Sequence, residues 1–243
     1  MGFFVAISFL TILPCPVKGK LDPKVFGRSV AYFPLVGLTL GLIVVGLDAL
    51  LNRLLPRAAM DAVLIVAFVI LTGALHLDGF IDCCDALFGP GDPESRLARL
   101  KDPRAGAFGV VGAFCLLLVK YGALLSLNSS IKPYSLLVAP TLGRWGTAYA
   151  IYFYPYKEGP GMGRIFKEEA SLAAFLVATV TALAVSVVAL QGTGLILMLA
   201  SWLVTVAFSS FVLKRIPGLT GDTYGAVNEV IEALVLLVTS SRG

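Results

Sequence analysis

The sequence predicts an all-α, polytopic integral membrane bundle of about seven transmembrane helices, plus a short N-terminal interfacial or tilted helix. Of the 243 residues, 58% are hydrophobic and only 14% are charged, whereas soluble domains carry about 25% charged residues. The mean hydropathy of +0.89 is far above that of a soluble enzyme. The apolar segments lack period-two alternation, so helices are the structure that satisfies their backbone groups in lipid. The same numbers exclude a disordered chain or a nucleic-acid binder, and the length predicts a single domain over residues 1–243.

The apolar segments can be taken in order along the chain. The first, Phe3–Leu13, is short for a span, so we expect an interfacial or tilted helix. Seven further segments approach the roughly 20 residues that a helix needs to cross the hydrocarbon core. Gly37 and Gly41 form a G-x-x-x-G step, which is typical of close helix packing. The seven segments are Ser29–Leu51, Ala59–Leu77, Ala107–Leu127, Tyr134–Tyr154, Ser171–Leu190, Gly194–Leu213 and Thr223–Val238.

The basic residues are distributed unevenly over the connections between these segments. Of the 19 Lys and Arg residues, 13 fall on alternate connections of one side, four on the other, and Lys120 and Arg144 within spans. The positive-inside rule makes the richer side cytoplasmic. The alternation also supports the number of spans, because one missed span would scramble it. The 13 residues are Lys18, Lys20, Lys24, Arg28, Arg96, Arg99, Lys101, Arg104, Lys157, Arg164, Lys167, Lys214 and Arg215.

Three aspartates follow the span Ala59–Leu77. Asp78, Asp82 and Asp85 are spaced i, i+4, i+7, so on a helix continuing from that span they share a face within about 60°. No Lys or Arg lies near them in the sequence, so their mutual repulsion requires protonation or a cation. All-oxygen ligands suit a hard divalent cation, and Mg²⁺ binds through a few carboxylates plus substrate phosphates. With a basic connection downstream, we interpret the cluster as a phosphate or diphosphate site.

A second acidic group opens the last segment and falls on one side of its helix. Ionisable residues at membrane depth are costly and are either functional or paired. Two interpretations therefore stay open: these residues contribute to the site, or they pair with Lys120 or Arg144. The group consists of Asp222, Asn228, Glu229 and Glu232.

Three isolated polar residues have competing interpretations. Arg144, near the middle of its span, either clamps a substrate phosphate or neutralises the acidic face. For Lys120 we expect a side chain that snorkels to the interface. His76, the only histidine, faces away from the aspartates, so a helix-packing hydrogen bond is favoured over a catalytic role.

Several strings together resemble one enzyme family. TGALHLDG at residues 72–79, KDPRAGAFG at 101–109 and GLTGDTYGAVNE at 218–229 are similar to motifs of cobalamin synthases, the adenosylcobinamide-GDP ribazoletransferases. Phe9–Pro14 and Tyr32–Gly37 fit the same family, so the resemblance runs almost from end to end. It implies a Mg²⁺-dependent transferase that joins adenosylcobinamide-GDP to α-ribazole or its 5′-phosphate and releases GMP. It also implies a prokaryotic plasma (inner) membrane enzyme with a cytoplasmic active site.

On this resemblance each candidate residue receives a role as a hypothesis. The ribazole hydroxyl attacks the phosphorus on the cobinamide side, and its proton passes to Asp85, Asp102 or Glu229. The predicted Mg²⁺ ligands are Asp78, Asp82, Asp85, Asp222 and Glu229. The predicted substrate contacts are Lys101, Arg104, Arg144, Arg164, Asn228, Glu232 and His76.

Other functions predict different features. A CDP-alcohol phosphotransferase predicts D-x-x-D-G-x-x-A-R, a pattern that Asp78-Gly79 and Asp85-Ala86 break. A cation-coupled transporter predicts acids throughout the membrane depth and inverted repeats. The expected partners are the two small-molecule substrates and the lipid bilayer, without nucleic acid. Whether copies of the chain form a homo-oligomer stays open.

Overall fold

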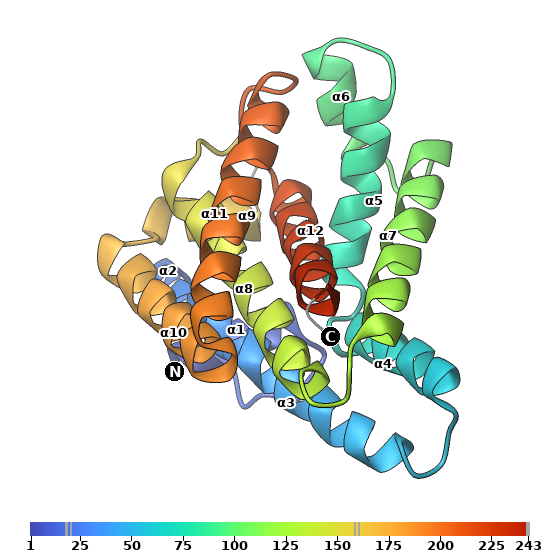
Figure 1. The fold of residues 1–243 in the computed structure, drawn as a ribbon. Coiled ribbons are helices and arrows are strands. Elements are labelled where there is room, and N and C mark those ends of the chain that lie inside the picture. Colours follow the sequence, from blue (N-terminus) through green and yellow to red (C-terminus); the bar gives the residue numbers. More distant parts are fainter. Residues whose placement is uncertain (18, 20, 158, 160, 242–243) are drawn as a thin grey trace.

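A computed structural model of the chain describes residues 1–17, 19, 21–157, 159 and 161–241 (Figure 1). Lys18, Lys20 and Arg242, three of the counted basic residues, lie outside this part. The described chain is helical without a β-strand, and a single backbone bridge joins Tyr156 to Leu219. The all-α prediction is therefore confirmed. The helices are α1 (Gly2–Leu10), α2 (Pro23–Ser29), η1 (Val30–Tyr32), α3 (Phe33–Leu51), α4 (Arg57–Leu71), α5 (Leu75–Phe88), α6 (Pro93–Arg99), α7 (Ala107–Ser126), α8 (Lys132–Phe153), α9 (Met162–Glu169), α10 (Leu172–Leu190), α11 (Gly192–Leu213) and α12 (Gly221–Ser240).

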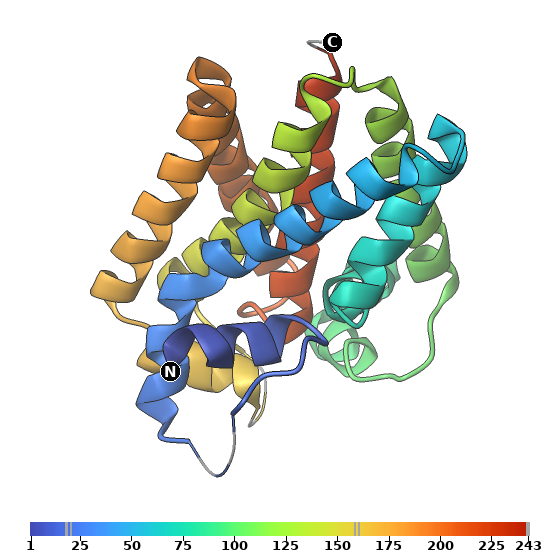
Figure 2. The same ribbon diagram turned by 90° about the horizontal axis from the view of Figure 1, so that it is seen from below.

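Two helices, α8 and α12, form the centre of the bundle. They pack against each other, α3 covers α8, and α5 and α7 cover α12 (Figures 1 and 2). The G-x-x-x-G step makes the α3–α8 contact, because a Cβ at Gly37 would lie 2.2 Å from the Pro140 carbonyl oxygen. Gly41 approaches the Leu136 carbonyl oxygen in the same way. The close packing predicted for this step is confirmed.

The outer helices present apolar side chains to the surroundings. Val188 at the end of α10 is 84% exposed, and Phe114 on α7 is 67% exposed. A water-soluble protein would bury such groups, whereas a bilayer accepts them. Within the described residues, five helical stretches are long and apolar enough to span a membrane, and a bent pair of helices would make a sixth. The five are Pro23–Leu51, Ala107–Ser126, Leu172–Leu190, Gly192–Leu213 and Gly221–Ser240.

The bent pair corrects one prediction. The aspartate helix was expected to continue from the span Ala59–Leu77, but α4 ends at Leu71 and α5 leaves it at 89°. Gly73 and Ala74 both have left-handed backbones (φ 58° and 59°). Their N–H groups bond to the carbonyls of Ile70 and Val69, which is the Schellman ending of a helix, with glycine at C′. The aspartates therefore lie on a separate helix.

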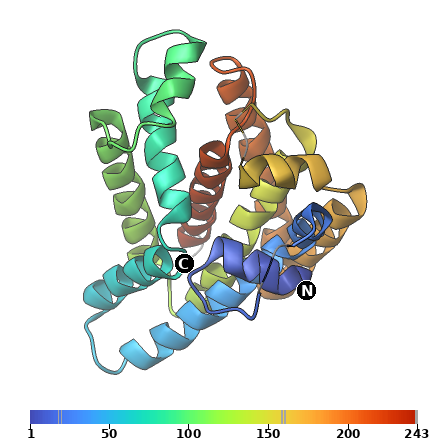
Figure 3. The ribbon, with the colours of Figure 1, turned by 180° about the vertical axis from the view of Figure 1, so that it is seen from behind.

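The N-terminal helix is short, as expected, and packs with two other short helices. α1 spans nine residues, too few to cross the hydrocarbon core. It contacts α2, and α2 contacts α9, so the three gather at one side of the bundle (Figure 3). Phe166 of α9 is buried against Phe9 and Phe33, with ring centroids 4.7 and 5.4 Å away. This aromatic contact fixes α9 on the bundle.

Candidate active site

A close helix crossing brings Asp222, the first acid of the second predicted group, next to α5. A Cβ at Gly79 would lie 2.8 Å from Asp222 Cα, and a Cβ at Gly225 would lie 3.1 Å from the His76 carbonyl oxygen. α5 and α12 therefore touch through glycines. This contact places Asp222, in the first turn of α12, beside the helix that carries Asp78 and Asp82.

The aspartates of α5 remain accessible. Asp78 is exposed, and Asp82, Asp85 and Asp222 are half-buried. Asp82 lies within electrostatic range of Asp78, Asp85 and Asp102. Within the described chain, no Lys or Arg forms an ion pair with an α5 aspartate. Neighbouring carboxylates that have no basic partner favour binding of a cation, because the cation relieves their mutual repulsion.

Asp85 differs from Asp78 and Asp82 because its carboxylate accepts hydrogen bonds from the backbone at the start of α7. It accepts the Gly106 N–H at 2.7 Å and the Gly109 N–H at 2.9 Å. Since Gly106 is the N-cap of α7, the carboxylate satisfies backbone donors that a helix start leaves unpaired. A Cβ at either glycine would come within 2.5 Å of an Asp85 oxygen. Asp85 therefore fixes the end of the basic connection to α5.

The predicted metal ligands do not form a ready-made cage. Among the described residues, no three His, Cys, Asp or Glu side chains are placed to hold a metal ion. The chemistry of Asp78, Asp82 and Asp222 still fits a hard cation, because all are carboxylates at an accessible helix crossing. Metal binding by these residues therefore stays a prediction. Glu229 lies apart from them in a different environment.

The remaining acids of α12 are buried and paired. Lys120 Nζ lies 2.6 Å from Glu229 Oε2 and 2.8 Å from Glu232 Oε2. Arg144 Nη1 lies 2.9 Å from Glu232 Oε1, which also accepts the Asn228 amide at 2.9 Å. The pairing alternative is thus the one found for Glu229 and Glu232, whereas no such pair with Lys120 or Arg144 is seen for Asp222 among the described residues. The snorkelling predicted for Lys120 is wrong, because the side chain is buried between two glutamates.

This pairing also bears on the roles predicted for the four residues. Of the two interpretations of Arg144, neutralisation of an acid is observed, because its guanidinium pairs with Glu232 and its side chain is fully buried. Glu229 is a poor metal ligand or general base here, since its charge is balanced by Lys120 in a buried network. Asn228 and Glu232 are buried with it, so none of the four is offered to a substrate at the surface.

The basic connection borders an open pocket of about 410 Å³. Asp102 accepts two hydrogen bonds from the Arg104 guanidinium, at 2.9 and 2.8 Å. These bonds lower the pKa of Asp102 to about 2, so at neutral pH it is a weak base. Arg96 donates to the carbonyls of Ala86 and Leu87 at the end of α5. The pocket is lined by Asp85, Gly89, Pro90, Arg99, Asp102, Arg104, Gly106, Ala107 and Phe108.

His76 is buried without the helix-packing hydrogen bond predicted for it. Its side chain is 3% exposed, and neither ring nitrogen has a hydrogen-bond partner within the described part of the chain. It lines a cavity of about 60 Å³ together with Thr147, Phe166 and Tyr224. A cavity of this size accommodates a few water molecules.

Arg164 lies on the other side of the α5–α12 crossing, on α9. It is exposed and pairs with Glu168 at 2.7 Å. Both residues line a pocket of about 290 Å³ with Tyr156, Lys157 and Lys167. Burial lowers the pKa of Lys167, whose ammonium donates to the Tyr152 carbonyl at 2.8 Å. Tyr156, Lys157 and Lys167 were not among the predicted site residues, although Lys157 and Lys167 flank Arg164 at the same basic connection.

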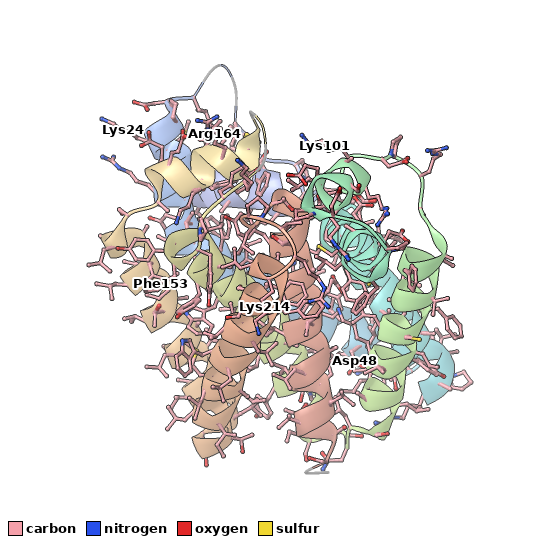
Figure 4. All side chains as sticks on the ribbon, turned by 90° about the horizontal axis from the view of Figure 1, so that it is seen from above. Lys24, Asp48, Lys101, Phe153, Arg164 and Lys214 are labelled. Atoms are coloured by element: carbon pink, nitrogen blue, oxygen red, sulfur yellow. The ribbon has the colours of Figure 1, made fainter. Side chains whose placement is uncertain are left out.

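The basic segments meet at one end of the molecule. Lys24, Arg164 and Lys101 lie along the same edge, Lys24 and Arg164 near α2 and α9 and Lys101 beside α6 (Figure 4). These residues belong to three of the connections that the charge asymmetry placed together. Asp85 lines the pocket beside Arg104, and Asp222 comes three residues after Leu219, whose carbonyl accepts the Lys157 N–H of the pocket on α9.

Comparison with known proteins gives a consistent result. The family model described as cobalamin-5-phosphate synthase matches residues 2–240. Proteins named adenosylcobinamide-GDP ribazoletransferase are similar over nearly their whole length. The one from Geotalea daltonii is 36% identical, covering 99% of this chain and 97% of the relative. The one from Pseudomonas paraeruginosa is 39% identical, covering 97% and 96%. No solved structure matches the chain.

Proposed function

The chain belongs to the cobalamin-5-phosphate synthase family, and we propose that it joins adenosylcobinamide-GDP to α-ribazole or its 5′-phosphate with release of GMP. The observation that carries this proposal is the family match over residues 2–240, which includes all the acidic and basic motifs. The relatives named for ribazole transfer are similar over nearly the full length of the chain. The phospholipid-synthesis and transporter alternatives are therefore not favoured.

The accessible aspartates are proposed to hold the metal. Asp78 and Asp82 lie on α5, and Asp222 lies in the first turn of α12 beside Gly79, where the two helices cross; their donor chemistry fits Mg²⁺. A bound Mg²⁺ supplies charge neutralisation for the diphosphate and the leaving GMP. Glu229 is not included in this set, because Lys120 already neutralises it.

The chain's own groups then position the reactants. Arg104 at the pocket beside α6, and Lys101 on the same connection, contact the diphosphate of adenosylcobinamide-GDP. The acceptor hydroxyl attacks the phosphorus on the cobinamide side, the bond to the GMP oxygen breaks, and the hydroxyl proton passes to a carboxylate. Of the three proposed bases, Asp102 is paired with Arg104 and Glu229 with Lys120. Asp85, on α5, is the one without a basic partner in the described chain.

The active site is proposed to face the cytoplasm from the plasma membrane of a prokaryote. Both basic pockets lie at the end of the bundle that carries Lys24 and Lys101 (Figure 4). The positive-inside rule assigns such an end to the cytoplasm.

The reaction is tested with the purified protein in detergent or liposomes. We expect GMP release from adenosylcobinamide-GDP with α-ribazole or its phosphate, dependent on Mg²⁺ and lost on chelation. Turnover of CDP-diacylglycerol with an alcohol, or uptake of a cation without GMP release, would support one of the other functions. Activity that persists in excess chelator would overturn the metal mechanism while leaving the transferase assignment.

A further inference from the structure

The second basic pocket has no role in the reaction described so far. It lies on α9 and the segment before it, and its charged lining residues are Lys157, Arg164, Lys167 and Glu168. The diphosphate is assigned to the pocket beside α6, across the acidic helices (Figure 4). A transferase that joins two substrates needs a second binding region, on the acceptor's side of the reacting atoms.

We infer that the pocket formed by Tyr156, Lys157, Arg164 and Lys167 binds the 5′-phosphate of a phosphorylated ribazole acceptor; this inference rests on the proposed ribazole transfer. We call it the acceptor-phosphate pocket. It determines which form of the acceptor the enzyme prefers.

Charge and size both fit a phosphate monoester. Among the described lining residues, three bases and the acid Glu168 sum to a charge of +2, and a phosphate monoester carries about −1.5 to −2 at pH 7. The Arg164 Nε–H donates a hydrogen bond to Glu168, which leaves the other guanidinium donors for the ligand. The open pocket of about 290 Å³ is large enough for a phosphate and the ribose attached to it.

The pocket is built on parts of the fold that are held firmly. Phe166, between Arg164 and Lys167 on α9, is 1% exposed and lies in the aromatic cluster of α1 and α3. A Cβ at Gly163 would come 2.7 Å from the Tyr156 hydroxyl, so the helix lies directly against that ring. The basic side chains therefore project from a fixed support, which favours specific binding.

Backbone hydrogen bonds connect the pocket to the metal-binding end of α12. The Lys157 N–H donates to the Leu219 carbonyl at 2.9 Å, and the Leu219 N–H donates to the Pro155 carbonyl at 2.8 Å. Three residues after Leu219 comes Asp222. The Tyr156 and Tyr224 rings also stack, with centroids 6.1 Å apart. A ribose whose phosphate lies in the pocket is thereby directed toward the proposed metal ligands.

The test compares the two acceptors in the full-length protein. For Arg164→Gln and for Lys157→Gln/Arg164→Gln, we expect the KM for α-ribazole 5′-phosphate to rise by about 10-fold or more, since charge-assisted hydrogen bonds are the strong ones. The KM values for unphosphorylated α-ribazole and for adenosylcobinamide-GDP should change little. Lys167 is left intact, because its bond to the Tyr152 carbonyl gives it a structural role.

Controls separate phosphate recognition from other effects. Lys24→Gln removes an exposed positive charge at the same end of the molecule and should leave all three KM values unchanged. Inorganic phosphate should compete with the phosphorylated acceptor in the wild type and less in Arg164→Gln. The difference in KM between the wild type and Arg164→Gln for the phosphorylated acceptor should persist in detergent without anionic lipid. A difference that appears only with phosphatidylglycerol would assign the pocket to lipid phosphates and overturn the inference.

The other outcomes are equally decisive. Equal loss with both acceptors, or a change confined to adenosylcobinamide-GDP, overturns the pocket while the transferase function stands. No GMP release by the wild type with either acceptor overturns the proposed function, and this inference with it.

Discussion

The two acidic groups of this molecule, one on α5 and one inside α12, have opposite surroundings. Glu229 and Glu232 are buried, and each lies within 2.8 Å of the Lys120 ammonium. Asp78 and Asp82 are accessible and have no basic partner in the described chain. A charge in a membrane bundle persists only if it is paired or reaches water. The contrast separates acids that are neutralised within the bundle from the unpaired acids of α5 that we propose as metal ligands.

The largest expected effect comes from breaking the paired group. Glu232→Ala leaves Lys120 and Arg144 with a single glutamate in a buried site, which typically costs about 3–5 kcal/mol. We expect a large drop in the melting temperature in detergent. Glu168→Ala removes an acid from an exposed i,i+4 pair and should cost about 0.5 kcal/mol or less. Equal melting temperatures for the two variants would contradict the comparison.

Removing a charge from the unpaired group on α5 should lower the activity without lowering the stability. Asp82→Asn removes one of several like charges, so we expect unchanged or higher stability with about 100-fold lower GMP release. Mg²⁺ at 100 times its Kd should raise the free energy of unfolding of the wild type by about 2.7 kcal/mol, and thus its melting temperature, and should do so much less in the variant. Asp92→Asn, at an exposed N-cap that asparagine also serves, is the matched control. An unstable Asp82→Asn variant with full activity would show that this acid is structural.

A smaller effect is expected where Asp85 holds the basic connection. Gly109→Ala places a Cβ 2.4 Å from the Asp85 carboxylate, so the hydrogen bonds must shift at a cost of about 1–3 kcal/mol. Activity should fall as Arg104 is displaced. Gly122→Ala on the same helix meets nothing within 4 Å and should be neutral or stabilising. Both variants behaving alike would argue against a positioning role for Asp85.

The smallest expected effect is the pH dependence of the stability that the Asp102–Arg104 pair contributes. The Arg104 hydrogen bonds depress the folded-state pKa of Asp102 to about 2, so the stabilisation they give is present above the unfolded pKa of about 3.9 and is lost only as the pH falls through about 2. The difference in melting temperature between wild type and Arg104→Gln should therefore be constant from about pH 5 to 9. A difference that varies over this window would contradict the pairing.

The sequence anticipated some of these features and missed others for identifiable reasons. Composition and helical spacing predicted a helical membrane bundle and put Asp78, Asp82 and Asp85 on one helix, because both follow from local chemistry. The turn at Gly73 was missed, since a glycine inside an apolar run is also compatible with an uninterrupted helix. Lys120 was misassigned because its partners lie 109 and 112 residues away.

By itself, then, the sequence determined the class of protein, the asymmetry of charge between its two ends and the family, since these depend on residue types and on motifs read along the chain. The tertiary structure alone decided which acids are neutralised. Periodicity assigns a residue to a face of its helix, but only the packing of α7, α8 and α12 brings Lys120 and Arg144 to Glu229 and Glu232. The same packing leaves the α5 aspartates open where α5 crosses α12. Distance in space, rather than distance in sequence, sets the energy of a charge.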